Sequence, residues 1–317
     1  MKVIFDTNAY RSLAKIIFTT DNDAENRAKI LQLAKKEQAK NIQIELSYHV
    51  LLELLCHLSD EKDEGYESCK SALNLAILHC GVPKISDSLE LTILEEFDKA
   101  KFNLYKHKYE DIWKTSCEFA TNRQSDIFKR NVQILKDELR WIKEGVSKGF
   151  DLMTIDFKNG KIKKNPLVII DSINHEYYFQ LLSKMAYCGV IPDNISTAID
   201  NRNLEDIIDY IEENRIAFDK IIEKHFVGFA HTNKIINNKY GDKEPMGRTF
   251  SNNFLDIEIC FLIDRFSDST LVTNDGFSST NASRTKIHST FKEIGFSSRI
   301  KDLNSYLEFI ELPQFKI

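Results

Sequence analysis

Short apolar segments separated by helical patterns, near both ends of the chain, are the feature that most constrains the fold. Val3–Phe5 indicates a buried strand, and Ile42–Leu46 alternates like a second strand. Thr270–Thr273 and Phe296–Ile300 indicate two more strands near the carboxyl end. Because strands joined by helices form right-handed βαβ units, we predict an α/β fold with a mainly parallel central sheet.

Helical periodicity fills the segments between these strands. We predict helices over residues 24–36 and 66–77, a helix capped by Ser47, and helices over residues 252–264 and 283–294. From residue 84 to 248 long charged segments carry an apolar residue every three or four positions. The predicted organisation is a discontinuous core of residues 1–83 and 249–317, interrupted by a mostly helical insertion of residues 84–248.

Four acidic residues stand where a purely structural role is hard to explain. Asp6 and Asp275 each follow an apolar strand, and in open α/β sheets ligands bind at the carboxyl ends of the strands. Glu53 and Asp256 lie inside strongly apolar helical segments, where an unpaired charge is costly. A divalent cation is the simplest group that would compensate several carboxylates at one sheet edge.

Each acid also has an ordinary structural interpretation. Asp6 suits the N-cap of a following helix, and Glu53 can escape from the buried face of its helix. Asp256, placed near a helix start, is favoured there by the helix dipole. Asp275 belongs to an Asn-Asp-Gly sequence that is typical of turns. The agreement of the four positions favours a shared site, and oxygen-only ligands suit Mg²⁺ or Mn²⁺.

The order of these residues resembles that of the PIN-domain nucleases. The resemblance covers about residues 1–83 and 249–317, and it implies a three-layer α/β/α core with a mainly parallel sheet. It also implies that Asp6, Glu53, Asp256 and Asp275 bind Mg²⁺ or Mn²⁺ and position the water that hydrolyses an RNA phosphodiester. The long helical segment between Glu53 and Asp256 departs from the compact members of the family.

The resemblance also assigns supporting roles. Residues expected to orient the carboxylates are Thr7, Asn8, Thr273 and Asn274. Arg284 and Lys286, which follow the last acidic motif, are expected to contact the RNA substrate. The predicted activity is that of a metal-dependent endoribonuclease.

Other functions are compatible with parts of the pattern. A structure-specific DNA nuclease uses related metal chemistry, and a non-catalytic PIN-like scaffold would bind a protein partner through its helices. A phosphatase of the haloacid dehalogenase type needs a second Asp two positions after the first, where this chain has Asn8. An antitoxin-like regulatory protein or a second copy of the chain is a further possible partner.

Composition excludes several classes of protein. The net charge of −5 gives no general attraction to nucleic acid, so binding would depend on local cationic groups or on metal. The six cysteines include no C-x-x-C pair, which indicates reduced thiols; for Cys56-His57 and His79-Cys80 core packing is favoured over metal ligation. Without a signal sequence or a long apolar stretch, the expected location is the cytoplasm, with no membrane association.

Overall fold

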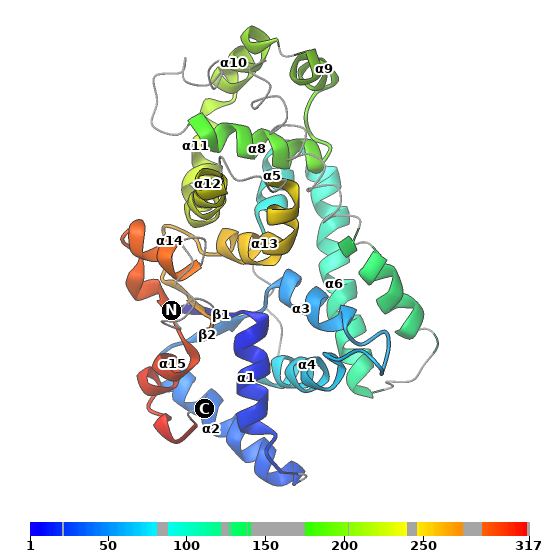
Figure 1. Ribbon diagram of the computed structural model, residues 1–317, viewed down its shortest axis with the longest axis vertical. Helices are drawn as coiled ribbons and strands as arrows, with labels where there is room; N and C mark the ends of the chain where they lie inside the picture. Colours follow the sequence, from blue (N-terminus) through cyan, green and yellow to red (C-terminus); the bar gives the residue numbers. More distant parts are fainter. Residues whose placement is uncertain are drawn as a thin grey trace. The chain divides into compact units, whose positions relative to one another are not determined.

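The computed structural model of the chain describes residues 1–20, 22–80, 88–121, 126, 128–137, 139–140, 175–201, 203–239, 246–274 and 287–315 (Figure 1). The chain forms two compact units. The first contains residues 1–86, 108–142 and 266–317, and the second contains residues 87–107 and 143–265. The sheet lies in the first unit, and the helix that carries Asp256 lies in the second.

Among the described residues, four strands form one parallel sheet in the order β2-β1-β3-β4. The strands are β1 (Lys2–Phe5), β2 (Gln43–Glu45), β3 (Ser269–Val272) and β4 (Ile300–Lys301). The apolar side chains of β1 are fully buried, as are Leu271 and Val272 of β3. A sheet of this kind, connected through helices, makes the α/β class predicted from the sequence correct.

The register aligns the carboxyl ends of the central strands. Phe5 of β1 lies opposite Val272 of β3, and Leu271 lies opposite Ile300 of β4. The pairing continues one residue beyond each strand, because the amide of Asp6 donates to the Val272 carbonyl at 3.0 Å and that of Thr273 donates to the Lys301 carbonyl at 3.0 Å. Asp6 and Thr273 are therefore neighbours at the carboxyl edge of the sheet.

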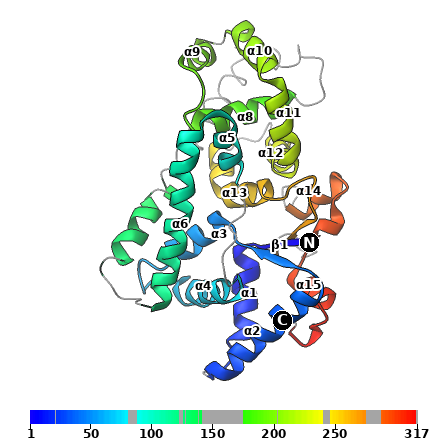
Figure 2. The ribbon, with the colours of Figure 1, turned by 180° about the vertical axis from the view of Figure 1, so that it is seen from behind.

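Helices accompany the strands in the first unit. α1 packs closely on α4, as Figures 1 and 2 both show, and it also contacts α2, α3 and α15. The helices are α1 (Thr7–Ile17), α2 (Asp23–Ala39), α3 (Tyr48–Cys56), α4 (Tyr66–Cys80), α14 (Ile287–Glu293) and α15 (Leu303–Phe309), with short 3-10 helices η3 (Ser297–Arg299) and η4 (Pro313–Phe315). Residues 128–137 are also helical.

The core of this unit includes a polar network. Glu37 of α2 accepts a hydrogen bond from the Tyr306 hydroxyl at 2.6 Å, and its Oε2 lies 2.8 Å from Nε2 of His79. Phe5 packs against Tyr10, His79 and Tyr306, with ring centroids 5.1 to 5.5 Å apart. The network links α2, α4 and α15 beneath β1.

Two predictions from the sequence are wrong at element boundaries. Most of the strand expected at Phe296–Ile300 is the 3-10 helix η3, because the amide of Arg299 bonds back to the carbonyl of Phe296 at 2.8 Å. The helix expected from residue 252 begins at Met246, so Asp256 lies well past the first turn and the helix dipole does not stabilise it.

The second unit is helical in its described part. Its helices are α5 (Leu89–Phe97), the beginning of α6 (Lys99–Thr121), α8 (His175–Tyr187), α9 (Asp193–Asn201), α10 (Leu204–Glu213), α11 (Arg215–Lys224), α12 (Phe226–Lys239) and α13 (Met246–Phe261). A core from α5, α8, α11, α12 and α13 includes Leu181, Phe218, Phe229 and Phe261. None of the helices in the described part of the chain has the length and apolar character needed to cross a membrane.

Candidate active site at the carboxyl edge of the sheet

Asp6 joins β1 to α1 and is buried, with 8% of its surface exposed. It is the N-cap of α1: its Oδ1 accepts a hydrogen bond from the amide of Ala9 at 2.6 Å. Its other oxygen, Oδ2, accepts from the hydroxyl of Thr273 at the end of β3. The N-cap role expected from the sequence is thus present, and the same carboxylate is also held from the neighbouring strand.

Glu53 is brought to the same edge by α3, which follows β2. The Ser47 side chain caps this helix by accepting from the amide of Val50 at 3.4 Å, as its sequence indicates. The leucines on both sides of Glu53 are buried, whereas Glu53 is only half-buried. Its Oε2 accepts a hydrogen bond from the hydroxyl of Thr7, the residue directly after Asp6.

Thr7 and Thr273 therefore each hold one of two neighbouring carboxylates. Thr7 lies in the first turn of α1 and is buried, and Thr273 is fully buried. Hydroxyl donors of this kind fix the orientation of the carboxylates that accept from them.

Asn274 has a different role from the two threonines. Its amide nitrogen donates to the Ser12 hydroxyl at 3.1 Å, and its oxygen accepts from the amide of Leu303 at 3.1 Å. It therefore ties the end of β3 to α1 and α15. Asn8 is exposed on the first turn of α1, and among the described residues its side chain makes no hydrogen bond to Asp6 or Glu53.

The other predicted site residues are placed differently or lie outside the described residues. Asp256 is half-buried on α13, in the second unit, whereas Asp6 and Glu53 belong to the first. Asp275, Arg284 and Lys286 lie outside the described residues. The predicted residues that the structure brings together are Asp6, Glu53, Thr7 and Thr273.

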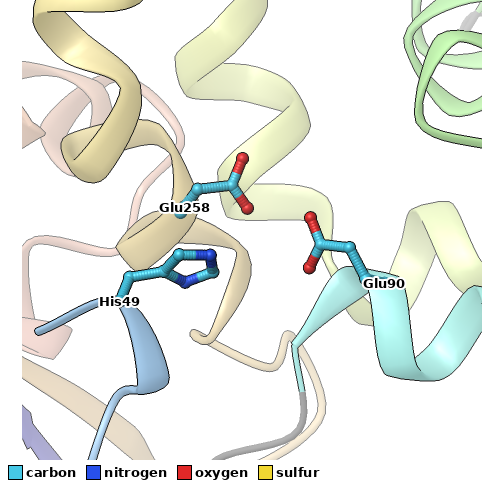
Figure 3. Close-up of side chains that lie close together, drawn as sticks. All are labelled: His49, Glu90 and Glu258. Atoms are coloured by element: carbon cyan, nitrogen blue, oxygen red, sulfur yellow. The ribbon is translucent and has the colours of Figure 1, made fainter. Parts of the chain in front are cut away.

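The second unit contains two acidic residues whose pairing is not evident from the sequence. Figure 3 shows the carboxylates of Glu90 on α5 and Glu258 on α13 directed toward each other; His49, drawn with them, belongs to the first unit. Lys184 of α8 forms an ion pair with Glu258 and another with Glu90, the latter at 3.2 Å. The ammonium group also lies over the ring of Phe261, 5.4 Å from its centroid.

Burial and the neighbouring charges shift the pKa values of this group in opposite directions. Burial raises the pKa of Glu258 to about 8, although the charge of Lys184 acts in the opposite direction. Burial alone would lower the pKa of Lys184, but the two carboxylates outweigh it and raise the pKa. Two carboxyl groups therefore face one ammonium group.

The local sequence indicates the burial of Glu258 but not its pairing with Lys184. Glu258 stands two residues after Asp256 in an apolar helix, so the two acids were expected on different sides, as they are: Glu258 is fully buried and Asp256 half-buried. The cation that compensates Glu258 is far away in the sequence, and nothing in the spacing of Lys184 indicates the pairing.

The sequence matches no protein-family model, and neither the curated proteins nor the solved structures include a significant match.

Proposed function

We propose that the chain is a metal-dependent endoribonuclease with a PIN-like core, in which carboxylates at the carboxyl edge of the sheet bind Mg²⁺ or Mn²⁺. The observation that carries the proposal is the hydrogen bond from the hydroxyl of Thr7, the residue directly after Asp6, to Glu53. Both acids therefore lie at the edge where parallel sheets bind their ligands. In the sequence the two acids are separated by the helices α1 and α2 and the strand β2, and each is held by a threonine hydroxyl.

The donor set fits a hard divalent cation. Glu53 uses Oε2 for the Thr7 hydrogen bond, and its Oε1 has no hydrogen bond among the described residues. The oxygens of Asp6 accept from the amide of Ala9 and from the hydroxyl of Thr273. Mg²⁺ and Mn²⁺ prefer such oxygen ligands and are commonly bound through one or two carboxylates together with substrate phosphate oxygens.

The reaction that we propose for this site is the hydrolysis of a phosphodiester bond. A bound ion of this kind supplies a water of lowered pKa and compensates charge on the leaving oxygen. Asp6 and Glu53 would hold the ion, and Thr7 and Thr273 would keep the carboxylates oriented. The resemblance also implies Asp275 as a ligand, and Arg284 and Lys286, which follow it in the sequence, would contact the RNA.

The test is cleavage of single-stranded RNA, structured RNA and flap DNA in the presence of Mn²⁺ or Mg²⁺, with an EDTA control. The decisive variant is Asp6→Asn, because Asn keeps the N-cap of α1 while removing the charge. We expect a loss of activity of at least about 100-fold, as the charge that holds the ion disappears.

Asp302→Asn is the matched control. Asp302 also follows a strand of the sheet and caps a helix, accepting from the amide of Ser305 at 2.8 Å, but it lies two strands from β1, about 10 Å away. We expect this variant to cleave like the parent. Preferential cleavage of flap DNA would indicate the DNA nuclease, and folded protein that cleaves none of the substrates with metal would contradict a nuclease and favour a scaffold.

A further inference from the structure

The turn between α3 and α4 contains a histidine held by a carboxylate. Nδ1 of His57 lies 2.9 Å from Oδ1 of Asp63, and the same oxygen accepts a hydrogen bond from the amide of Gly65 at 2.8 Å. The hydrogen bond from His57 is the main cause that lowers the pKa of Asp63 below its usual value. Asp63 is therefore an acceptor, Nδ1 carries the donated hydrogen, and Nε2 is the ring nitrogen left to meet a ligand.

Gly65 makes room for this pair. A Cβ atom on Gly65 would lie 2.9 Å from Nδ1 of His57 and 3.2 Å from Oδ1 of Asp63. The first distance is shorter than carbon and nitrogen tolerate, so any side chain here would displace the ring. The turn is thus shaped around the His57–Asp63 pair.

A second cationic group approaches the same turn from the helix of residues 128–137. Nζ of Lys136 donates to the hydroxyl of Ser59 at 3.3 Å, and its charge also helps lower the pKa of Asp63. His57 is not packed in the core as the sequence suggested, since 39% of its side chain is exposed. In the described part of the chain, Nε2 of His57 has no hydrogen-bond partner.

His57 follows Glu53 by four residues. Residues spaced in this way lie on one side of a helix, about 5–6 Å apart at Cβ, and helical side chains lean toward the amino-terminal turn. His57 has helical backbone angles at the C-cap of α3, so this geometry extends to it. The imidazole therefore lies one turn along the helix from a carboxylate of the candidate active site.

We propose that His57, oriented by Asp63, and Lys136 form a contact point for the phosphate next to the cleaved bond in a single-stranded RNA. The inference rests on the proposed function of Asp6 and Glu53. With Nδ1 donating to Asp63, Nε2 of the protonated imidazole would donate a second hydrogen bond to a phosphate oxygen, and the ammonium group of Lys136 would supply further positive charge. One helical turn separates this point from Glu53, so it serves the neighbouring phosphate and leaves the scissile one to the carboxylates.

The test is equilibrium binding of a short labelled single-stranded RNA to the full chain in EDTA, measured by fluorescence anisotropy over a range of salt concentrations. We expect His57→Gln and Lys136→Gln each to weaken binding several-fold. The loss of one phosphate contact should also make the salt dependence of log K shallower by about 0.7. Lys62→Gln is the control. Lys62 is exposed in the same turn, but its side chain is part of neither the His57–Asp63 pair nor the Lys136–Ser59 pair, so this variant should keep the salt dependence of the parent.

The role of Asp63 is tested by rescue. Asp63→Ala should weaken RNA binding as His57→Gln does, because the ring loses its fixed orientation. Asp63→Asn keeps an acceptor for Nδ1 and should retain most of the binding. If both variants fold like the parent and bind RNA equally well, Asp63 does not position His57 for RNA.

The two proposals can fail independently. If the parent binds RNA through His57 and Lys136 but cleaves none of the substrates with metal, the nuclease is wrong and the contact point stands. If the parent cleaves RNA while His57→Gln and Lys136→Gln keep its KM and its salt slope, the contact point is wrong and the nuclease stands. RNA that does not bind the parent at all would overturn the contact point.

Discussion

At the scale of single residues, the hydroxyl of Thr7, the residue directly after Asp6, holds the carboxylate of Glu53. Thr7→Val keeps the shape of the side chain and removes the donor to Glu53. Loss of an outer partner of a metal ligand typically costs 10–100-fold in metal affinity, and we expect the Mn²⁺ concentration for half-maximal cleavage to rise by about that factor. Thr7→Ser retains the hydroxyl and should resemble the parent; an unchanged metal requirement in Thr7→Val would show that the hydrogen bond does not matter for binding.

The buried network around Glu37 gives a prediction of stability. Tyr306→Phe removes a donor 2.6 Å from a carboxylate that is only 3% exposed. A hydrogen bond to a charged group contributes about 1.5–3 kcal/mol, and we expect a loss of unfolding free energy of that size in urea. Combined with Glu37→Gln in a double-mutant cycle, the two losses should be less than additive; strict additivity would contradict a direct interaction.

Local sequence patterns indicated the candidate site residues that follow a strand directly or lie on a helix that follows one. Asp6 follows an apolar strand and Ser47 caps the helix of Glu53, so both acids could be assigned to the same sheet edge from local patterns. His57 could not be recognised in this way, because its partner Asp63 lies across a turn and Lys136 belongs to a distant helix. Such pairs depend on tertiary packing.

At the scale of elements, the packing of α12 on α13 depends on a glycine. A Cβ on Gly228 would lie 2.1 Å from Cδ1 of Phe261, whose ring packs edge-on against Phe229. Helix propensity alone predicts that Gly228→Ala stabilises the protein by about 1 kcal/mol. Overpacking a buried ring costs typically about 1–3 kcal/mol, so we expect net destabilisation in urea unfolding.

The control for this prediction makes space for the added methyl group. In the Gly228→Ala background, Phe261→Leu should cost less than it does alone, because the smaller side chain relieves the clash. If Gly228→Ala raises the midpoint of unfolding, the close approach of α12 and α13 does not limit stability.

Element boundaries were less predictable than element types. The strands β1, β2 and β3 and the helices α2, α3 and α4 follow from periodicity and caps in the sequence. β4 is shorter than expected because its first residues close a 3-10 turn, and Nε of Arg299 donates to the carbonyl of Ser269 at 2.9 Å. A hydrogen bond to a neighbouring strand is invisible in a local pattern.

At the scale of the whole molecule, the sequence predicted the α/β class, because the parallel sheet follows from strands that alternate with helices. The division into units depends on packing over long distances. The first unit includes residues 108–142, and the second includes α13, whose sequence continues directly into β3. The apolar faces of those helices are evident in the sequence, but their partners are not.

The buried group of Lys184, Glu90 and Glu258 should make the stability of the folded chain depend on pH. The pKa of Glu258 is about 8 in the folded protein, raised by burial, against about 4.3 for an unperturbed Glu. For a raised pKa, the stabilising contribution is complete below the unfolded value and is lost as pH rises through the folded value. We therefore expect the free energy of unfolding to fall between about pH 5 and pH 8, by at most about 1.4 kcal/mol per pH unit from this group, and the melting temperature to fall with it.

Glu258→Gln tests the assignment of this pH dependence, because Gln keeps a donor and an acceptor but does not ionise. The variant should lose most of the decline in melting temperature over that range. Glu308→Gln, which changes the same residue type at an exposed position of α15, should retain the decline of the parent. If Glu258→Gln and the parent show the same pH dependence, Glu258 is ionised throughout the range and the charge of Lys184 outweighs burial.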